Sequence, residues 1–354
     1  MGAVVGAVSF AVFGPPSTSA AVVVQVPSTR VAAPAPAPTT TGPPAATPAS
    51  EPAPATTSTT VTERGELVIQ GVGDVSFDPA YIAAFREVGY EAAFEGLDGI
   101  LLEDDLTVIN LECPVTDVGA PADKAYSFRC DPAALPIAAA HGVDVANLAN
   151  NHGQDRGTEG MLDSVDQLDW AGITAVGVGS DIHRAMTAAY FDIDGWTVAV
   201  LGMGGVVPGE GWLADEDRPG MASGDDVEQM GAAVAAADQR ADVVVVTIHW
   251  GRELVTEPDP LDRERAEAMV EAGADVVFGH HAHRLGAMEM IGDTPVFWTL
   301  GNFIWPRLSA AGAVSAVARV TLSPDGSVGA CLVPVEIEES GRPRLTDGSE
   351  CPEE

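Results

Sequence analysis

The stretch DVVFGHHAHRLG, from Asp275 to Gly286, places three histidines within four positions directly after an apolar run. Only seven histidines occur in the 354 residues of the chain, so this cluster calls for an explanation. A short apolar run bounded by turn residues is typical of a buried strand. The stretch therefore predicts a strand that ends in a polar turn, and the same unit recurs along the chain.

From Glu66 onward, strand patterns alternate with helical patterns. We expect strands at 66–73, 106–112, 143–149, 172–179, 196–204, 241–250, 274–281 and 294–302, and a final pair at 313–324 and 326–338. We expect helices at 79–97, 131–140, 158–171, 225–240 and 260–272. The alternation predicts an α/β fold, and the PDG turn between the last two strands predicts an antiparallel pair.

The two ends of the chain differ in composition from this central part. Residues 1–26 contain an apolar run, Ala3–Phe13, of the length of a signal or anchor segment, although no Lys or Arg precedes it. The alternative is a disordered apolar tail. Residues 27–64 are rich in Pro, Ala and Thr and predict a disordered linker. We therefore expect an exported protein, extracellular or at the cell surface, with a folded domain at 65–339 and a polar tail at 340–354.

The charge of the chain excludes one class of partner. The sequence has 52 acidic and 17 basic residues, a formal net charge of −35. Nucleic acids and anionic lipid headgroups are bound through Lys and Arg, so we expect no nucleic-acid partner. The four cysteines are too few and too scattered for a disulfide framework or a thiolate metal site. In an exported chain, the pairs Cys113–Cys130 and Cys331–Cys351 are candidate bridges because each is close in sequence.

Polar residues recur at the ends of five predicted strands. They are Asp74; Asn110 and Glu112; Asn150, Asn151 and His152; His249; and His280, His281 and His283. In open α/β sheets, sites form outside the carboxyl ends of the strands, so these five ends are expected to converge. Carboxylate, amide oxygen and imidazole are ligands of first-row divalent metals. In an extended segment, His281 and His283 project to the same side. The alternative is a hydrogen-bonded polar cluster without metal.

Six motifs together carry a family resemblance. GDVSFD, NLECPVTD, NLANNHGQDRG, IHWGRE, GHHAHRLG and LGNFIW, spread from about Val68 to Trp305, resemble in order the motifs of the CapA family. These are poly-γ-glutamate capsule synthesis proteins related to calcineurin-like metallophosphoesterases. The resemblance implies that residues 65–339 form a four-layer α/β/β/α sandwich of the metallophosphoesterase type.

The resemblance also implies roles for individual residues. It makes Asp74 a ligand of one metal, Glu112 the carboxylate that bridges two metals, and Asn151 and His249 ligands of the second. His281 and His283 would each bind one of the two metals, and His152 would be the catalytic proton donor. His280 is expected to contact the ligand side chains and not the metal itself. Residues expected to line the mouth of the site and contact substrate are Asn110, Arg129, Asp155 and Asn302.

One departure affects the expected number of metals. Ser76 stands where the phosphoesterases have the histidine of a D-x-H motif, so the first metal has one ligand fewer. We therefore expect one or two divalent ions (Mn, Fe or Zn) per chain, and the sequence does not decide between these numbers.

Two functions follow from the resemblance. The first is a metal-dependent hydrolase that cleaves amide or phosphoester bonds, the amide being a γ-glutamyl linkage. The alternative is a non-catalytic component of polymer binding or export that uses the same metal cluster. Expected partners are an anionic polymer or a small-molecule substrate, other capsule-synthesis components, and a membrane tether through the N-terminus. Arg129, Arg156, Arg252 and Arg284 lie beside the motifs and would offset the acidic surface. His152 favours the enzyme, because binding alone does not need it.

Overall fold

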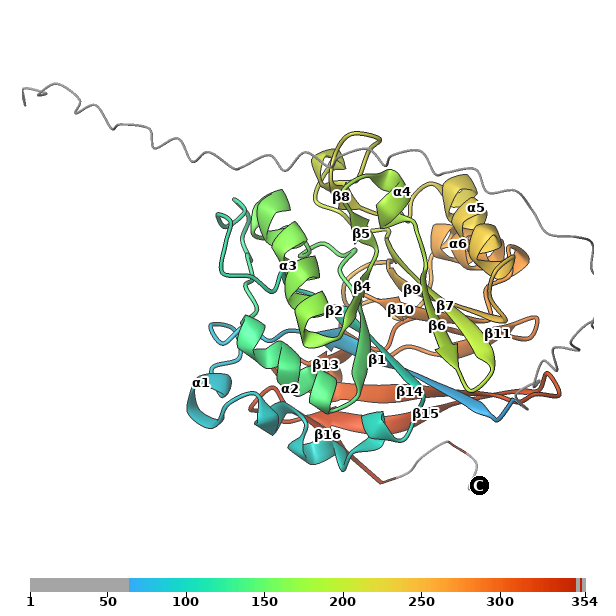
Figure 1. Ribbon diagram of the computed structural model, residues 1–354. Helices are drawn as coiled ribbons and strands as arrows, with labels where there is room; N and C mark the ends of the chain where they lie inside the picture. Colours follow the sequence, from blue (N-terminus) through green and yellow to red (C-terminus); the bar gives the residue numbers. More distant parts are fainter. Residues whose placement is uncertain (1–63, 348–350, 352–354) are drawn as a thin grey trace, which may run out of the picture. The chain divides into compact units, whose positions relative to one another are not determined.

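Two large mixed β-sheets organise the part of the chain that the computed structural model describes, residues 64–347 and 351. The expected α/β class is confirmed, because parallel strands in both sheets are connected through helices (Figure 1). The signal or anchor segment and nearly all of the predicted linker lie outside the described residues. Within these residues, no helix is long and apolar enough to cross a membrane.

Eight of the described strands form the first sheet, in the order β16–β15–β14–β1–β2–β3–β4, with β13 beside β1. Their bounds are β1 (Leu67–Val75), β2 (Leu106–Leu111), β3 (Val143–Asn147), β4 (Thr174–Val176), β13 (Asn302–Ile304), β14 (Val314–Leu322), β15 (Val328–Ile337) and β16 (Pro343–Leu345). Strands β1 to β4 are parallel, whereas β14, β15 and β16 pair antiparallel. The predicted antiparallel pair at the end of the chain is thus confirmed.

Six described strands form the second sheet, in the order β11–β12–β10–β9–β7–β6. They are β6 (Ala189–Ile193), β7 (Trp196–Gly204), β9 (Val243–His249), β10 (Val276–His280), β11 (Met288–Ile291) and β12 (Thr294–Phe297). A small pair consists of β5 (Val178–Gly179) and β8 (Gly220–Met221). The predicted strand 294–302 is divided, because the chain leaves the second sheet after β12 and enters the first sheet at β13. This crossing brings the two sheets together at the candidate site.

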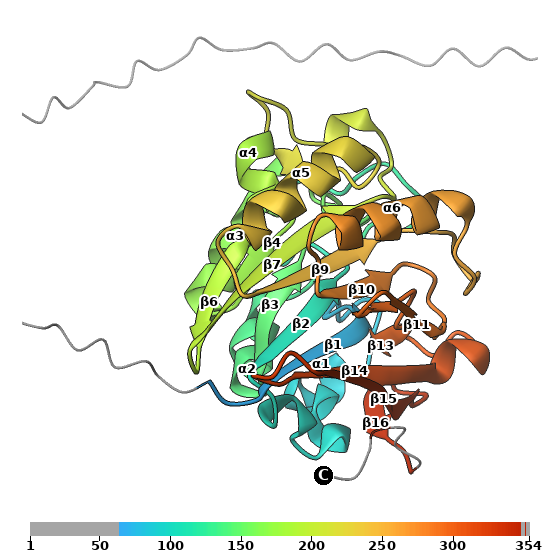
Figure 2. The ribbon, with the colours of Figure 1, turned by 90° about the vertical axis from the view of Figure 1, so that its right-hand side faces the viewer.

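Helices pack against the outer faces of both large sheets, and one short helix, Ile182–Ala185, packs against the small pair β5–β8. They are α1 (Phe85–Val88), α2 (Leu135–Ala140), α3 (Gly157–Ala171), α4 (Ile182–Ala185), α5 (Val227–Asp238) and α6 (Pro260–Glu271). The 3₁₀ turns are η1 (Glu91–Ala93), η2 (Glu95–Leu97), η3 (Ile100–Leu102), η4 (Pro132–Ala134), η5 (Glu210–Trp212) and η6 (Ala311–Ala313). Figure 2 shows α5 and α6 over the second sheet, while α2 and α3 pack against the first.

The apolar core between the sheets explains their face-to-face packing. Ile69 and Val108 of the first sheet meet Val200, Val245 and Phe278 of the second in one buried cluster. The strands supply apolar residues on both faces, as expected for strands buried on both sides. Two further cores lie between each sheet and its helices.

The predicted helix at 79–97 is wrong. The segment forms α1, η1 and η2 instead of one helix. Gly89 has a φ of 79°, which ends the first turn. The break lets Phe85, Tyr90 and Phe94 all pack around the ring of Phe77, with ring centroids 6.3–6.4 Å from it. Tertiary packing of these aromatic rings therefore overrides the local helical pattern.

The described part of the predicted polar tail contains a strand and a disulfide-bonded cysteine. Residues 343–345 form β16, which pairs with β15. Cys351 forms a disulfide with Cys331 of β15, and Cys113 forms one with Cys130. Both candidate bridges are present in the structure.

Candidate metal centre

The carboxyl ends of strands from both sheets meet at one place. Asp74 of β1 lies in register with Asn110 of β2 and with Asn302 of β13. In the second sheet, His280 of β10 lies opposite His249 of β9. The Nδ2 atom of Asn110 is 3.2 Å from Nδ1 of His249, so this contact joins the two sheets. The expected convergence of strand ends is present.

Two groups of potential metal ligands share one carboxylate. Asp74, Glu112 and His283 place ligand atoms within 4.8 Å of one another, and so do Glu112, His249 and His281. Glu112 belongs to both groups. Asn151 lies beside the second group, where its Oδ1 is 3.0 Å from Nε2 of His249.

The chemistry of these residues fits divalent metal ions. Glu112 Oε1 and His281 Nδ1 are buried atoms without a hydrogen-bond partner, and Asp74 Oδ2 lies 2.9 Å from His283 Nδ1. Buried polar atoms are normally satisfied, so each unsatisfied atom calls for a partner. Both carboxylates are fully buried. Oxygen and imidazole ligands without thiolate suit Mn, Fe or Zn. A cation at the cluster would satisfy these atoms and offset the buried negative charge.

The protonation of the cluster also fits this assignment. Burial and the charge of His281 hold the pKa of His249 well below its ordinary value. Burial and the charge of His283 lower the pKa of His281 to about 4. Both rings are therefore neutral at pH 7, which is the state in which imidazole coordinates a metal.

The pKa values of the two buried carboxylates, Asp74 and Glu112, are shifted in opposite directions. Burial raises the pKa of Asp74, but interactions with His280 and His283 outweigh it and hold that pKa well below its ordinary value. Burial and the charge of Asp74 raise the pKa of Glu112. Burial opposes protonation of His283, yet Glu112 and Asp74 raise its pKa to about 9. The cluster thus retains protons that a bound metal would displace.

The H-x-H segment is not extended, contrary to the prediction. His281 and His283 have φ values of 89° and 52°, in the left-handed region that non-glycine residues rarely adopt. The chain turns here because β10 ends at His280. The turn brings the His281 ring to 4.7 Å from the His249 ring and the His283 ring to 6.2 Å from the His281 ring. Such backbone conformations persist only where the surroundings enforce them, and they concentrate at functional sites.

Neighbouring side chains hold the candidate ligands in place. Asn302 Oδ1 lies 2.9 Å from His283 Nδ1, and Trp305 stacks on the same ring at 4.7 Å. His280 contacts Thr247 through Nε2 and lies 3.6 Å from Asp74 through Nδ1. Asn110 donates to Asp74 at 2.8 Å and is fully buried, so it lies beneath the cluster and not at its mouth.

His152 belongs to a second constellation beside the cluster. Its Nδ1 lies 2.7 Å from Asp155 Oδ2 and 3.1 Å from Lys124 Nζ. Lys124 Nζ in turn pairs with Asp155 Oδ1 at 2.5 Å and donates to the Asn151 carbonyl at 2.6 Å. Phe128 stacks on the His152 ring at 4.2 Å. The ring is therefore oriented through Nδ1, which leaves Nε2 for a reacting group.

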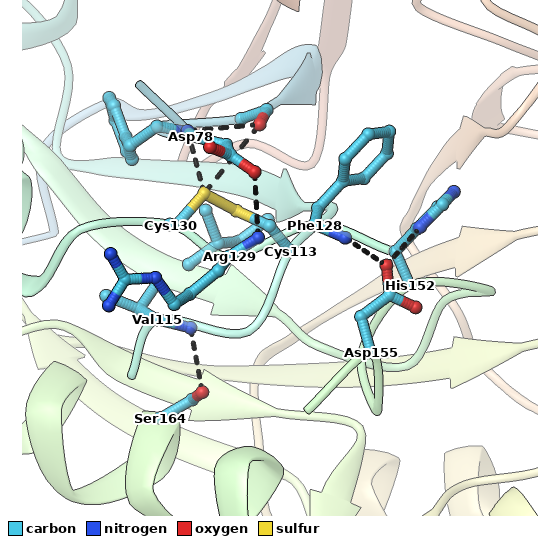
Figure 3. Close-up of a disulfide and its surroundings, with 12 residues drawn as sticks. Asp78, Cys113, Val115, Phe128, Arg129, Cys130, His152, Asp155 and Ser164 are labelled. Carbon is cyan, nitrogen blue, oxygen red and sulfur yellow. Dashed lines mark hydrogen bonds and ion pairs between the residues drawn. A yellow bond between two sulfur atoms is a disulfide. The ribbon is translucent and has the colours of Figure 1, made fainter. Parts of the chain in front are cut away.

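A disulfide-closed loop forms one wall of this constellation (Figure 3). The Cys113–Cys130 bridge closes a segment whose Phe128 backbone N–H donates to Asp155 Oδ2 at 2.6 Å. Ser127 Oγ donates to the Asp155 carbonyl at 3.0 Å. Arg129 pairs with Asp117 at 2.7 Å and does not line the pockets described below. The loop thus delivers Lys124 and Phe128 to the site but not the predicted arginine.

Two adjoining pockets open beside His152. The first has a volume of about 370 Å³ and an aromatic wall formed by Tyr81, Tyr126, Phe128 and Trp305. The second, of about 320 Å³, is lined by Lys124 and Asn151 among others. Tyr126, His152 and Glu253 line both. A substrate in either pocket would therefore reach His152.

Sequence reasoning missed Lys124 and the aromatic wall. Lys124 is the only lysine in the chain, so its identity was an available signal. Tyr81, Tyr126 and Trp305 come from segments far apart in the sequence, and no local pattern indicates that they meet.

The fold and the site together define an α/β protein with a buried His/Asp/Glu cluster that can hold metal at the carboxyl ends of its strands. The model of the bacterial capsule synthesis protein PGA_cap matches residues 68–307, and the chain belongs to this family. The family predicted from the order of the motifs is thus confirmed.

Similar proteins carry names that agree with this assignment. The PGA biosynthesis protein CapA of Bacillus subtilis (strain 168) is 30% identical over 272 residues, covering 76% of this chain and 71% of that protein. The capsule biosynthesis protein CapA of Bacillus anthracis is 30% identical over 289 residues, covering 80% and 70%. The crystal structure of TT1561 of Thermus thermophilus aligns with a TM-score of 0.41 at 11% identity, over 75% of this chain and 97% of that one.

Proposed function

We propose that this protein is a metal-dependent hydrolase of poly-γ-glutamate capsule synthesis that cleaves amide bonds of the γ-glutamyl type or phosphoester bonds. The observation that carries this proposal is Glu112, which is shared by two ligand groups directly beside the oriented His152. The names of the two Bacillus relatives support the link to capsule synthesis. We also assign the sandwich to the metallophosphoesterase type.

The residues divide the work between metal binding and proton transfer. Asp74, Glu112 and His283 would hold one ion, and Glu112, His249 and His281, with Asn151 beside them, would hold the other. Bound divalent ions supply Lewis acidity and lower the pKa of water. His152 donates Nδ1–H to Asp155, so Nε2 is the atom that exchanges a proton with the reacting group: it accepts a proton in the neutral ring and donates one to the leaving group from the imidazolium form. Asp155 and Lys124 act as positioning residues.

A non-catalytic role in polymer binding is the second candidate, and Ser76 is the observation that favours it. Its hydroxyl lies 3.8 Å from Cys130 Sγ and accepts from the Asp78 backbone N–H at 3.3 Å, so it belongs to neither ligand group. With one ligand fewer, the Asp74 group would hold its ion more weakly than a D-x-H motif. Loss of one of the two ions would remove part of the Lewis acidity available for hydrolysis and would still leave a cation to bind an anionic polymer.

We propose that the protein works outside the cytoplasm, in the extracellular space or at the cell surface. Two disulfides support this location, because such bridges persist mainly in oxidising compartments. A membrane tether through the N-terminus, an anionic polymer or small-molecule substrate, and other capsule-synthesis components complete the proposal.

Metal content tests the proposal first. We would measure Mn, Fe and Zn per purified chain by mass spectrometry, beside His281→Ala/His283→Ala and the control His183→Ala, which alters an exposed histidine of α4. We expect one or two ions in the wild type and the control and a clear loss in the double variant. Equal metal content in all three proteins, or none after Mn²⁺, Zn²⁺ or Fe²⁺ is supplied, would refute the metal site.

Turnover then separates the two candidate functions. We expect the metal-loaded wild type to hydrolyse a γ-glutamyl oligomer or a phosphoester. The variant His152→Ala should keep its metal and lose about 100-fold or more in kcat, the range of general acid catalysis. Metal-loaded protein that binds the oligomer without cleaving it would favour the binding role.

A further inference from the structure

The aromatic-walled pocket beside the metal centre contains a single arginine. Among its described lining residues, Arg284 is the only arginine or lysine, and Glu253 is the only carboxylate. The pocket also includes His152 and the metal-ligand candidate His283. A ligand that reaches the metal centre from this side would therefore pass the guanidinium of Arg284.

Arg284 is held in place but is not neutralised. Its Nη1 donates to the carbonyl of His283 at 2.8 Å, and Thr299 donates to the Arg284 carbonyl at 2.9 Å. A Cβ at residue 312 would lie 2.7 Å from Nη1, so Gly312 makes the space for this side chain. No carboxylate of the described residues forms an ion pair with it. A guanidinium has five N–H donors in a fixed fork, so several donors remain for a ligand.

Two other basic residues near the site, Lys124 and Arg129, have no free cationic group to offer a ligand. Lys124 is engaged by Asp155 at 2.5 Å, and Arg129 by Asp117 at 2.7 Å. The formal net charge of −35 does not prevent anion binding at one point, because exposed charges beyond about 10 Å are screened at 0.1 M salt. Arg284 is thus the cation in the pocket that is left to bind an anion.

We infer that Arg284 is the residue that recognises a carboxylate of the substrate, which would lie across the two adjoining pockets. This inference rests on the proposed function, takes its γ-glutamyl chain as the substrate, and adds the residue that determines specificity for an acidic chain. Planar guanidinium and carboxylate groups match in paired hydrogen bonds. Both pockets border His152, so the chain has room to continue on either side of that residue.

Binding of matched oligomers tests the inference. The probes are a γ-linked glutamate oligomer and the same oligomer with its α-carboxylates converted to amides. Binding is measured by calorimetry on the metal-loaded full chain in a His152→Gln background, which stops turnover and keeps the metal ligands. On this parent we compare Arg284→Gln, Arg284→Lys and Glu253→Gln. The control is Arg263→Gln, an arginine of α6 that pairs with Glu289 and does not line the pockets.

We expect Arg284→Gln to weaken binding of the acidic oligomer about 10- to 100-fold, the range of hydrogen bonds to a charged group. The amide oligomer should bind both proteins equally. Arg284→Lys should restore part of the affinity, Glu253→Gln should increase it, and the control should not change it. Metal content should stay at the parent level in every variant.

Other outcomes would overturn the inference. An equal loss for both oligomers would show that Arg284 supports the fold of the pocket and does not recognise a carboxylate. A metal-loaded parent that binds neither oligomer would refute the substrate class while leaving hydrolysis of phosphoesters open. Absence of metal from the wild type would instead refute the proposed function, and the oligomer measurements would still decide the role of Arg284.

Discussion

The Cys113–Cys130 bridge should stabilise both the fold and the side chains around His152. The loop that it closes donates Phe128 N–H and Lys124 Nζ to Asp155, the residue that orients His152. Cys130 Sγ also accepts the backbone N–H of Phe77 at 2.8 Å. We therefore expect Cys113→Ala/Cys130→Ala to lose turnover as well as stability.

The magnitude follows from the length of the loop. The bridge spans 17 residues, and loop-closure entropy for that length corresponds to about 3 kcal/mol of unfolding free energy. The N–H of Phe77 would lose its buried acceptor, which adds about 1–3 kcal/mol. The second bridge, Cys331–Cys351, spans 20 residues and also corresponds to about 3 kcal/mol. It joins β15 to Cys351, and none of the described residues that it encloses lines the two pockets, so it is a matched control.

Urea denaturation, metal analysis and turnover together check this reasoning. We expect both double variants to lose about 3 kcal/mol or more, with the larger loss in Cys113→Ala/Cys130→Ala. Only that variant should lose turnover, by about 10-fold or more, while its metal content is unchanged. Equal turnover in the two variants under conditions where both are folded would refute the claim that the loop positions His152 through Asp155.

Three further substitutions test other parts of the structure. Lys124→Met leaves the fully buried Asp155 without its cation, so we expect a lower Tm and a loss of about 10- to 100-fold in kcat. The metal content should not change, and Lys124→Arg should have a Tm and a kcat closer to those of the wild type. Gly73→Ala would place a Cβ 2.3 Å from the Gly301 carbonyl oxygen, so urea denaturation should show a loss of about 1–3 kcal/mol in the free energy of unfolding. The metal content should also fall, because the clash displaces the adjacent Asp74. Burial outweighs the hydrogen bond from Thr107 and raises the pKa of Asp104 to about 7, so the folded state keeps a proton that the unfolded chain releases near pH 4. Stability should therefore fall as pH rises from about 4 to about 7, and urea midpoints should fall less over this range in Asp104→Asn.

The polar residues at the strand ends show which features of the fold and the site the local sequence pattern predicts. Apolar runs that stop at Asp74, Glu112, His249 and His281 predicted strands, and parallel strands in an α/β sheet bring their carboxyl ends to one edge. The types of these residues predicted the kind of ligand set. The two cysteine pairs were predictable because each pair is close in sequence. The local sequence pattern gave a wrong prediction of one helix at residues 79–97, because the packing of aromatic rings on Phe77 overrides helical periodicity there.

The sequence by itself determined the α/β class, the types of residue that gather at the candidate site, and the family. The tertiary structure alone decided that Glu112 is shared by both ligand groups, that Lys124 holds Asp155, and that Arg284 lines the pocket whereas Arg129 pairs with Asp117. It also decided the turned backbone at His281 and His283. The physical reason is that periodicity reports only which face of an element is buried. Contacts between elements depend on how the two sheets pack and where the connecting loops cross, and no local pattern carries that information.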